Sequence, residues 1–189
     1  MFIVCGPSGV GKHTILHRVM QEDPNLEYAV SATTRPPRTG EVNGKDYYFL
    51  DRAEFLRRVE AGEFAEWAQV HDHLYGTLRA ELGRRLASGR DVALDIDVQG
   101  MRNFKRLPYR MVTVFVMPPS IEVLEERLRA RRTDREEDIA LRLRNAREEM
   151  DARHAFDYII VNDAVDDAVA DMKAILRAQR CRASVAGGS

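Results

Sequence analysis

Residues 6–14 of the chain read Gly6-Pro7-Ser8-Gly9-Val10-Gly11-Lys12-His13-Thr14. The apolar residues 1–5 that precede this stretch are typical of a buried parallel strand, and residues 15–20 follow it with the apolar spacing of a helix. Because glycine lacks a Cβ, the backbone can turn its N–H groups toward an anion, and the helix N-terminus and Lys12 add positive charge. A strand, a glycine-rich loop and a helix in this order predict a phosphate-binding loop, although His13 stands where the pattern asks for serine or threonine.

Size and composition limit the class of protein. A chain of 189 residues is long enough for one substantial core and short for two domains, and its composition is that of an ordinary soluble protein. The net charge of -1 gives no general attraction to nucleic acid or to a membrane, and no apolar run reaches transmembrane length. Cys5 and Cys181 lie far apart and residues 1–5 read as a strand rather than a secretion signal, so we expect no disulfide and a cytoplasmic location.

Apolar stretches near residues 2, 92, 113 and 159 are each followed by a helical pattern. Repeated strand–helix units predict a parallel sheet covered on both faces, which is an α/β fold of three α/β/α layers. Residues 32–81 differ because they combine short strands, tight turns and many polar side chains. We therefore expect one domain, residues 1–189, with a core of about 1–31, 82–120 and 153–189, a mixed α/β insert of about 32–81, and a helical lid of about 121–152.

The local pattern also places individual elements. Residues 26–31 read as a strand, and the proline- and glycine-broken residues 32–40 read as a loop. Residues 64–70 alternate like a strand, a turn over residues 71–76 follows, and Trp67 is expected in the core. Residues 92–97 form a buried strand that carries Asp95 and Asp97 on one side of its carboxyl end. In the lid, one helix is expected to run from Ser120 to about residue 132 and a second from about residue 136 to 152.

A second anion site is indicated by Arg35 and Arg38, which flank two prolines. Proline stiffens such a loop, and arginine can bind a phosphate through two parallel hydrogen bonds. Ser31, Tyr47 and Tyr75 are candidates for additional hydroxyl donors. A solvated basic loop is the alternative, but the phosphate-binding loop elsewhere in the chain favours a second phosphate site.

Three carboxylates are candidates for ligand recognition. Glu66 lies on a strand among apolar neighbours, and a carboxylate can accept the two parallel N–H groups that guanine offers and adenine does not; the alternative is a carboxylate that faces water. Asp95 and Asp97 stand where ligands bind in an open α/β sheet. We expect one to contact the acceptor and one to hold water on Mg²⁺, and the alternative is pairing with arginines.

Arginines crowd residues 127–147, but acidic residues are interleaved with them. Most of these arginines are therefore expected on a solvated face, and a nucleic-acid surface is disfavoured. One or two near Thr133 are expected to reach over a transferring phosphoryl group. Neither His13 with His17 nor His71 with His73 has a third ligand beside it, so no zinc site is expected at either pair.

Over nearly its whole length the chain resembles guanylate kinase, a family of P-loop nucleoside monophosphate kinases. The motifs that carry the resemblance are residues 6–12, 31–41, 44–49, 63–67, 75–77, 94–100, 118–120, 127–134 and 161–163. So many motifs in one order are highly specific. The resemblance implies a P-loop kinase core, a GMP-binding insert and a lid, and the reaction of MgATP with GMP, or with dGMP, to give ADP and GDP or dGDP.

The resemblance also implies residue roles. For ATP, it implies binding by Gly6, Pro7, Ser8, Gly9, Val10, Gly11, Lys12, His13 and Thr14, with Asn162 near the adenine. For GMP, it implies binding by Ser31, Arg35, Arg38, Tyr47, Glu66, Tyr75, Thr77, Asp95 and Asp97. The catalytic residues would be Lys12, Arg38, Arg131 and Arg142. Mg²⁺ would be held mainly by phosphates and water, with Asp95 or Asp97 acting through water.

Three departures from the family pattern stand out. His13 replaces the usual serine, which bears on Mg²⁺ because imidazole is a poor ligand for a hard cation. Ala130 and Arg132 replace lid glycines, and Ala164 replaces an aspartate. The rival functions are a guanylate-kinase-like binding module that has lost catalysis and a P-loop kinase for another phosphorylated acceptor.

Overall fold

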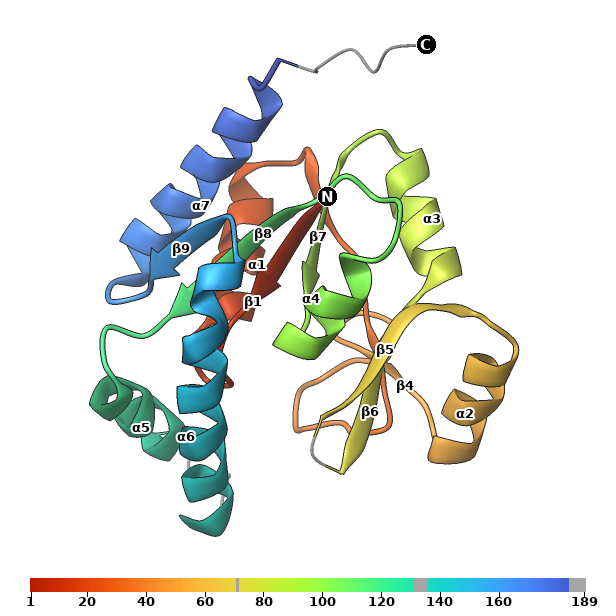
Figure 1. Cartoon of the computed structure of the whole chain (residues 1–189), viewed down its shortest axis with the longest axis horizontal. Helices are drawn as coiled ribbons and strands as arrows, with labels where there is room; N and C mark the ends of the chain where they lie inside the picture. The colour runs from red at the N-terminus through yellow and green to blue at the C-terminus, as the bar shows by residue number, and fades with distance from the viewer. Residues whose placement is uncertain (71, 131–135, 184–189) are drawn as a thin grey trace.

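The computed structural model describes residues 1–70, 72–130 and 136–183, and a parallel sheet lies at its centre (Figure 1). The strands are β1 (Phe2–Cys5), β2 (Leu26–Tyr28), β7 (Asp91–Asp95), β8 (Val112–Met117) and β9 (Tyr158–Val161). Their order is β2-β7-β1-β8-β9, and every neighbouring pair is parallel. The predicted α/β class with a parallel sheet is confirmed, and β1 leads into the glycine-rich loop from the middle of the sheet.

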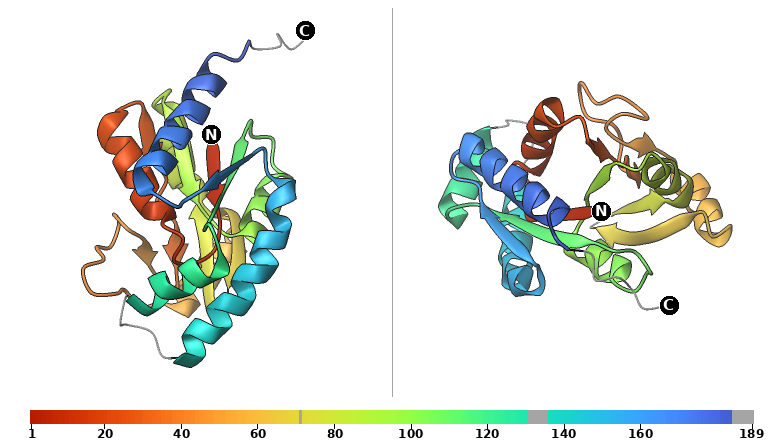
Figure 2. Two further views of the ribbon diagram at one scale, coloured as in Figure 1. Left: turned by 90° about the vertical axis from the view of Figure 1, so that its left-hand side faces the viewer. Right: turned by 90° about the horizontal axis from the view of Figure 1, so that it is seen from above.

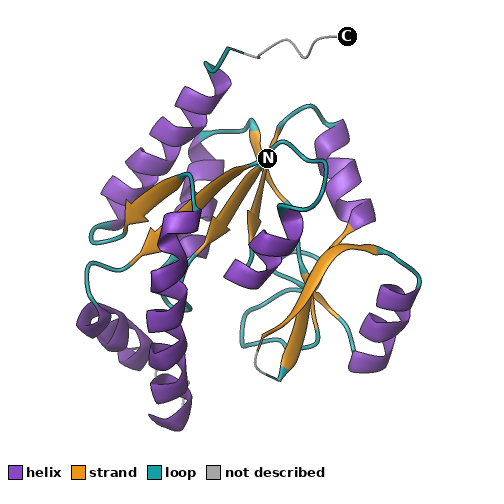
Figure 3. Cartoon of the chain, in the orientation of Figure 1, coloured by secondary structure: helices purple, strands orange, loops and turns teal. Residues whose placement is uncertain are grey.

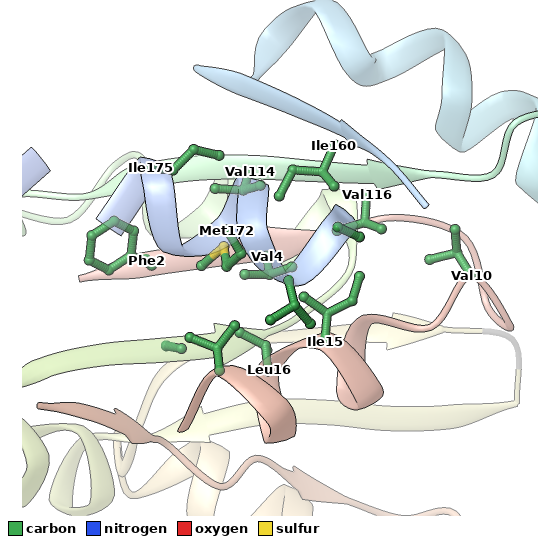
Figure 4. Close-up of a cluster of buried hydrophobic side chains, with 14 of the residues drawn as sticks. Phe2, Val4, Val10, Ile15, Leu16, Val114, Val116, Ile160, Met172 and Ile175 are labelled. Carbon is green, nitrogen blue, oxygen red and sulfur yellow. The ribbon is translucent and has the colours of Figure 1, made fainter. Parts of the chain in front are cut away.

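Side chains of β1 alternate between two hydrophobic clusters, as the period of a strand requires. Phe2 and Val4 pack with α1 (Lys12–Glu22) and α7 (Val165–Arg180), as Figure 4 shows. The two helices lie side by side on one face of the sheet (Figure 2). Ile3 and Cys5 face the other way, toward α3 (Arg79–Ala87) and α4 (Val98–Phe104). The sheet is therefore the middle of three layers, as predicted.

The insert forms a second, mixed sheet beside the core, shown as a separate group of strands in Figure 3. Its strands are β3 (Ala32–Thr33), β4 (Tyr48–Phe49), β5 (Phe64–Val70) and β6 (His73–Leu78), in the order β4-β3-β6-β5, with α2 (Arg52–Glu60) packed against them. Three local predictions were wrong. The strand predicted over residues 26–31 ends at 28 and the loop predicted over 32–40 begins with β3, which pairs with β4 and β6. The turn predicted over residues 71–76 is mostly β6, because those residues pair with β5.

Trp67 was predicted in the core and is 40% exposed instead. It lies on β5 between two buried positions, so it points to the outer face of the strand. The small core of the insert forms around Phe55 and Phe64, whose rings stack 4.4 Å apart, together with Ala32, Leu74 and Leu78.

The segment predicted to be a lid contains α5 (Ile121–Ala130) and α6 (Glu136–Asp151), and a short 3-10 helix, η1 (Ala152–Ala155), joins α6 to β9. Residues 131–135 lie outside the described residues, and with them the predicted helix end and break, Arg131 and Arg132. Cys5 is buried, Cys181 is exposed, and both are free thiols. Among the helices that the structure describes, none has the length and apolar character needed to cross a membrane.

Candidate functional site

The glycine-rich loop is folded tightly against the core. Gly6, Gly9 and Gly11 all have positive φ angles, which L side chains rarely adopt. A Cβ on Gly6 would lie 2.0 Å from the carbonyl oxygen of Val116. Gly11 is the N-cap of α1, so the loop ends with backbone N–H groups at a helix N-terminus. The sequence therefore builds here the anion-binding geometry that the motif predicted.

Lys12 extends across the mouth of this loop. Its Nζ donates to the carbonyl oxygens of Gly6 at 2.6 Å and Pro7 at 3.3 Å. The same Nζ lies 3.7 Å from Oδ1 of Asp95 at the end of β7. The ammonium group is thus held between the phosphate-binding loop and the carboxyl edge of the sheet.

Asn162 supports the loop from behind. It is 5% exposed, and its Nδ2 donates to the carbonyl oxygen of Val10 at 2.7 Å. Arg127 donates to the backbone carbonyls of Asn162 at 2.8 Å and Asp163 at 3.0 Å. Asn162 therefore shapes the loop, and its expected place near the adenine stays a prediction.

One pocket of about 410 Å³ joins the loop, the insert, the carboxyl edge of the sheet and α6. It contains most of the residues that the sequence singled out: Gly6, Ser8, Lys12, Ser31, Arg35, Arg38, Tyr47, Glu66, Tyr75, Asp95, Asp97 and Arg142. Predicted residues outside its lining are Pro7, Gly9, Val10, Gly11, His13, Thr14, Thr77 and Asn162. The catalytic prediction for Arg131 lies outside the described residues.

The arginine loop is organised by Glu41, which the sequence pattern gave no role. Its carboxylate accepts from Arg35 at 2.8 Å and from the backbone N–H of Arg38 at 2.7 Å. The guanidinium of Arg35 also lies over the ring of Tyr47, 5.4 Å from its centroid. Ser31 is buried, and its Oγ has no hydrogen-bond partner among the described residues. The spacing Arg38-Thr-Gly-Glu41 is that of a turn and was the available signal.

Glu66 is 7% exposed and projects into the pocket, so the alternative of a water-facing carboxylate is wrong. Its Oε1 accepts from Thr77 Oγ1 at 3.0 Å. Burial raises the pKa of Glu66 to about 7, opposed by the Thr77 hydrogen bond and reinforced by the charge of Asp97. A Cβ on Gly100 would lie 2.9 Å from Oε2, so this glycine makes room for the carboxylate.

Asp95 and Asp97 both line the pocket, but they belong to different elements and not to one strand as predicted. The strand ends at Asp95, and Asp97 is the N-cap of α4, where its Oδ1 accepts from the N–H of Gly100. Burial raises the pKa of both carboxyls above the ordinary value, and the positive charge of Lys12 opposes this rise without cancelling it. The prediction that both side chains extend from one strand was wrong, because the helix cap captures Asp97.

The helix α6 contributes one cation, Arg142, and two carboxylates, Asp138 and Glu149, to the pocket. Arg142 donates to Ser8 Oγ at 3.1 Å, which connects the lid to the phosphate-binding loop. Glu149, which the sequence pattern did not single out as a site residue, lies seven residues later and lines the same pocket. Burial raises the pKa of Glu149, and the charge of Lys12 opposes this. A spacing of seven puts two side chains on one helix face and was the signal that could have found it.

His13 is exposed, and its ring lies 6.2 Å from His17 and 6.4 Å from Tyr28 between centroids. Within the described ranges, no group of three or more histidine, cysteine, aspartate or glutamate side chains could hold a metal ion. The pocket therefore combines Lys12, Arg35, Arg38 and Arg142 as anion-binding cations with carboxylates as hydrogen-bond acceptors. Such a set of cations and hydrogen-bond acceptors is suited to binding phosphorylated ligands.

The family model described as "Guanylate kinase" matches residues 1–179. Among curated proteins, the chain is similar to a guanylate kinase of Thermotoga maritima, with 47% identity over 182 residues that cover 96% of this chain and 88% of the relative. It is also similar to a guanylate kinase of Rhodopseudomonas palustris strain BisB5, with 49% identity over 183 residues, 96% of this chain and 84% of the relative.

Solved structures give the same result. The guanylate kinase of Anaplasma phagocytophilum superposes with a TM-score of 0.78 at 35% identity, over 96% of this chain and 86% of the other. A shikimate kinase of Bacteroides thetaiotaomicron has a TM-score of 0.51 at 15% identity, over 93% of this chain and 97% of the other, and shares the fold alone. The fold is therefore that of the P-loop kinases.

Proposed function

The chain belongs to the guanylate kinase family, and we propose that its pocket transfers the γ-phosphoryl group of ATP to GMP, giving ADP and GDP. The observation that carries the proposal is the single pocket in which Lys12 of the phosphate-binding loop faces Arg35 and Glu66 of the insert. A donor phosphate, an acceptor phosphate and a guanine each have a chemically suitable partner there. We include dGMP as an acceptor, because the residues proposed for recognition address the base and the phosphate.

The proposed parts follow the predicted division. The core, about residues 1–31, 82–120 and 153–189, would bind ATP, the insert of about 32–81 would bind GMP, and the lid of about 121–152 would close over both. Closure would exclude water, which otherwise competes with GMP as acceptor.

On the acceptor side, we propose that Arg35, Arg38, Ser31, Tyr47 and Tyr75 hold the phosphate of GMP. The phosphate has a second pKa of about 6, so its oxygen is already a nucleophile at pH 7 and needs no general base. Glu66 would accept the paired N–H groups of guanine, with Thr77 orienting the carboxylate at 3.0 Å and Asp95 and Asp97 nearby. The protein's contribution is to align the attacking oxygen.

On the donor side, we propose that residues 6–14 bind the phosphates of ATP through backbone N–H groups, with Asn162 near the adenine. Lys12, Arg38, Arg142 and Arg131 would neutralise charge as the phosphoryl group moves. The contact of Arg142 with Ser8 at 3.1 Å supports this assignment, because it brings the lid cation to the loop. Arg131 is proposed from the resemblance alone.

The donor set fits Mg²⁺ bound mainly through phosphates and water. Asp95 and Asp97 bring carboxylate oxygens to the pocket, and hard oxygens are the ligands that this cation prefers. When bound, Mg²⁺ neutralises charge on the β- and γ-phosphates. We propose that one of the two aspartates holds a water on it, while Lys12 and Arg142 supply the protein's own positive charge.

No observation favours the rival function, a binding module without catalysis. Lys12, Arg35 and Glu66 all line the pocket, and the curated relatives named above are guanylate kinases. We propose ATP and GMP as the partners and, because Cys5 and Cys181 are free thiols, a reducing cytoplasm as the location.

The test is a coupled assay of ADP release with MgATP and, in turn, GMP, dGMP, AMP and UMP. We expect turnover with GMP and dGMP and at least about 100-fold lower kcat/KM with AMP and UMP, because only guanine offers Glu66 its paired donors. No turnover with any nucleotide would support the binding module. Turnover that favours AMP or UMP would overturn the assignment of GMP.

A further inference from the structure

Two helices of this chain carry the same charge pattern, a glutamate followed three and four residues later by arginines. On α2 the pattern is Glu54, Arg57 and Arg58, and the side chain of Glu54 is 29% exposed. On α3 it is Glu81, Arg84 and Arg85, and the side chain of Glu81 is 2% exposed. A glutamate is rarely buried without a task, so the second cluster requires an explanation.

Glu81 contacts two segments outside its own helix. Its Oε1 accepts from the backbone N–H of Val30 at 3.4 Å and from Nε of Arg85 at 2.9 Å. Its Oε2 accepts from Tyr48 Oη at 3.1 Å and also pairs with Arg84. Burial favours the neutral acid, but the bonds from Arg85 and Arg84 outweigh it and hold the pKa of Glu81 below its ordinary value.

The two segments that Glu81 contacts are those that carry the acceptor site. Val30 immediately precedes Ser31, and Tyr48 immediately follows Tyr47. Ser31 and Tyr47 line the pocket, and the N–H of Tyr48 donates to the carbonyl oxygen of Ser31 at 2.9 Å. Glu81 therefore lies directly behind the place where the core chain and the insert meet.

Arg85 extends the network into the core sheet. Its guanidinium reaches Oε2 of Glu27 on β2 at 3.3 Å. The network runs from β2 through Arg85 and Glu81 to Tyr48 on β4, so it joins the two sheets of the molecule. Glu81 is the buried centre of this network, while its arginines reach the surface. A paired charge network of this kind holds its members in one geometry.

We propose that Glu81 is a positioning residue for GMP, an inference that rests on the acceptor site of the proposed function. It fixes Val30 and Tyr48 from behind, and thereby sets the distance between Ser31 and Tyr47 in the pocket. Glu54 has arginines at the same two spacings, Arg57 and Arg58, but among the described residues it makes no side-chain contact of this kind to the acceptor site, so it has no such role.

The test compares Glu81→Gln with the matched control Glu54→Gln in the full-length protein. One amide oxygen cannot accept from all four donors that the two carboxylate oxygens of Glu81 serve. We expect KM for GMP to rise about three- to tenfold in Glu81→Gln, with kcat and KM for ATP within about twofold of wild type. Glu54→Gln should leave KM for GMP unchanged. Tyr48→Phe removes Oη, and with it the bond donated to Glu81 and the one accepted from Arg84; it should also raise KM for GMP and add little to Glu81→Gln.

A second measurement keeps this inference separate from the proposed function. Hydrogen exchange at the N–H of Val30 should be faster in Glu81→Gln than in wild type or in Glu54→Gln, whatever the substrate. Absence of GMP turnover in wild type would overturn the proposed function, and exchange would still decide whether Glu81 holds Val30. The proposal fails if KM for GMP rises equally in both glutamine variants, if KM for ATP rises as much as KM for GMP, or if neither KM nor exchange changes.

Discussion

The phosphate-binding loop presents mainly backbone to the pocket, whereas the acceptor side presents charged side chains from several elements. In the loop, a Cβ on Gly6 would lie 2.0 Å from the carbonyl oxygen of Val116, and a Cβ on Gly11 would lie 2.6 Å from Nδ2 of Asn162. On the acceptor side, Arg35 is held by the carboxylate of Glu41 at 2.8 Å. Loop geometry is therefore set by packing, and acceptor geometry by ion pairs.

This difference predicts which kinetic parameter each kind of substitution should change. Backbone N–H groups at a helix N-terminus bind any phosphate of suitable shape, so the loop supplies charge stabilisation rather than selectivity. In the proposed function, side chains such as Arg35 and Glu66 would distinguish one acceptor from another, because their hydrogen bonds match particular groups. Changes in the loop should reduce kcat, and changes on the acceptor side should raise KM for GMP.

The largest effect is expected for Lys12→Ala. Loss of the ammonium that spans the loop and Asp95 should lower kcat by about 100-fold or more, since it removes charge stabilisation in the transition state. Steady-state assays should be paired with circular dichroism to show that the variant folds. Lys173→Ala, which removes an exposed ion pair with Glu22 on the far side of the core, is the matched control and should keep wild-type turnover. Near-normal kcat in Lys12→Ala would remove the basis of the donor assignment.

A smaller and more selective effect is expected for Arg35→Lys. Lysine keeps the charge but loses the planar fork that binds two phosphate oxygens, so KM for GMP should rise by about tenfold or more. KM for ATP should change by less than about twofold, because the loop is untouched. Equal increases in both KM values would contradict the division into donor and acceptor regions.

The pH dependence of GMP binding should show a change of a few fold. Since burial raises the pKa of Glu66 to about 7, the carboxylate that guanine needs is lost as pH falls through that value. KM for GMP should therefore fall as pH rises from about 6 to about 8. This decrease should add to the one caused by titration of the GMP phosphate near pH 6. Glu66→Gln should retain only the phosphate titration, and an identical profile in both proteins would exclude Glu66.

The same pKa shift has a consequence for stability. The folded state binds the proton of Glu66 more tightly than the unfolded state, whose ordinary pKa is 4.5. The free energy of unfolding should therefore fall as pH rises from about 4.5 through 7. Thermal melts of Glu66→Gln should lack this decrease, which isolates the contribution of one carboxyl.

The smallest effect is expected for His13→Ser. His13 is exposed beside the loop, and a serine hydroxyl is a better ligand for a hard cation than imidazole. The Mg²⁺ concentration for half-maximal turnover should fall by a few fold, while KM for GMP stays constant. A fall in turnover at saturating Mg²⁺ would instead show that the imidazole itself contributes to the reaction.

The sequence predicted what depends on local pattern. The loop, the parallel sheet and its helices follow from short-range signals, and the family resemblance located Arg35, Glu66 and Asp95 through their motifs. Gly76 shows the limit of local pattern. It was assigned to a turn, but it lies within β6, where a Cβ would come within 2.8 Å of Phe64. Only the pairing of β5 with β6 explains that glycine.

The contacts that hold the site in place were the part that sequence could not predict. Glu81 contacts Val30 and Tyr48, which are distant in the chain. Glu41 contacts Arg35 and Arg38 within one turn, and Glu149 lies seven residues after Arg142, but charged residues are common enough that such spacings alone do not select them. Asp97 was singled out as a site residue and lines the pocket, but it was wrongly placed on a strand, because a helix N-cap and a strand end look alike when an aspartate precedes a valine. Tertiary packing, rather than propensity, decides such cases.

The central claim is that Glu66 makes the acceptor side selective for guanine. The most direct test measures kcat/KM for GMP and for AMP, in wild type and in Glu66→Gln, and compares the GMP-to-AMP ratio of the two proteins. The amide would present an NH₂ group to a guanine donor, so we predict that the ratio falls by at least about tenfold while KM for ATP stays within about twofold. An unchanged ratio in a folded, active variant would contradict the account, because guanine would then be recognised elsewhere.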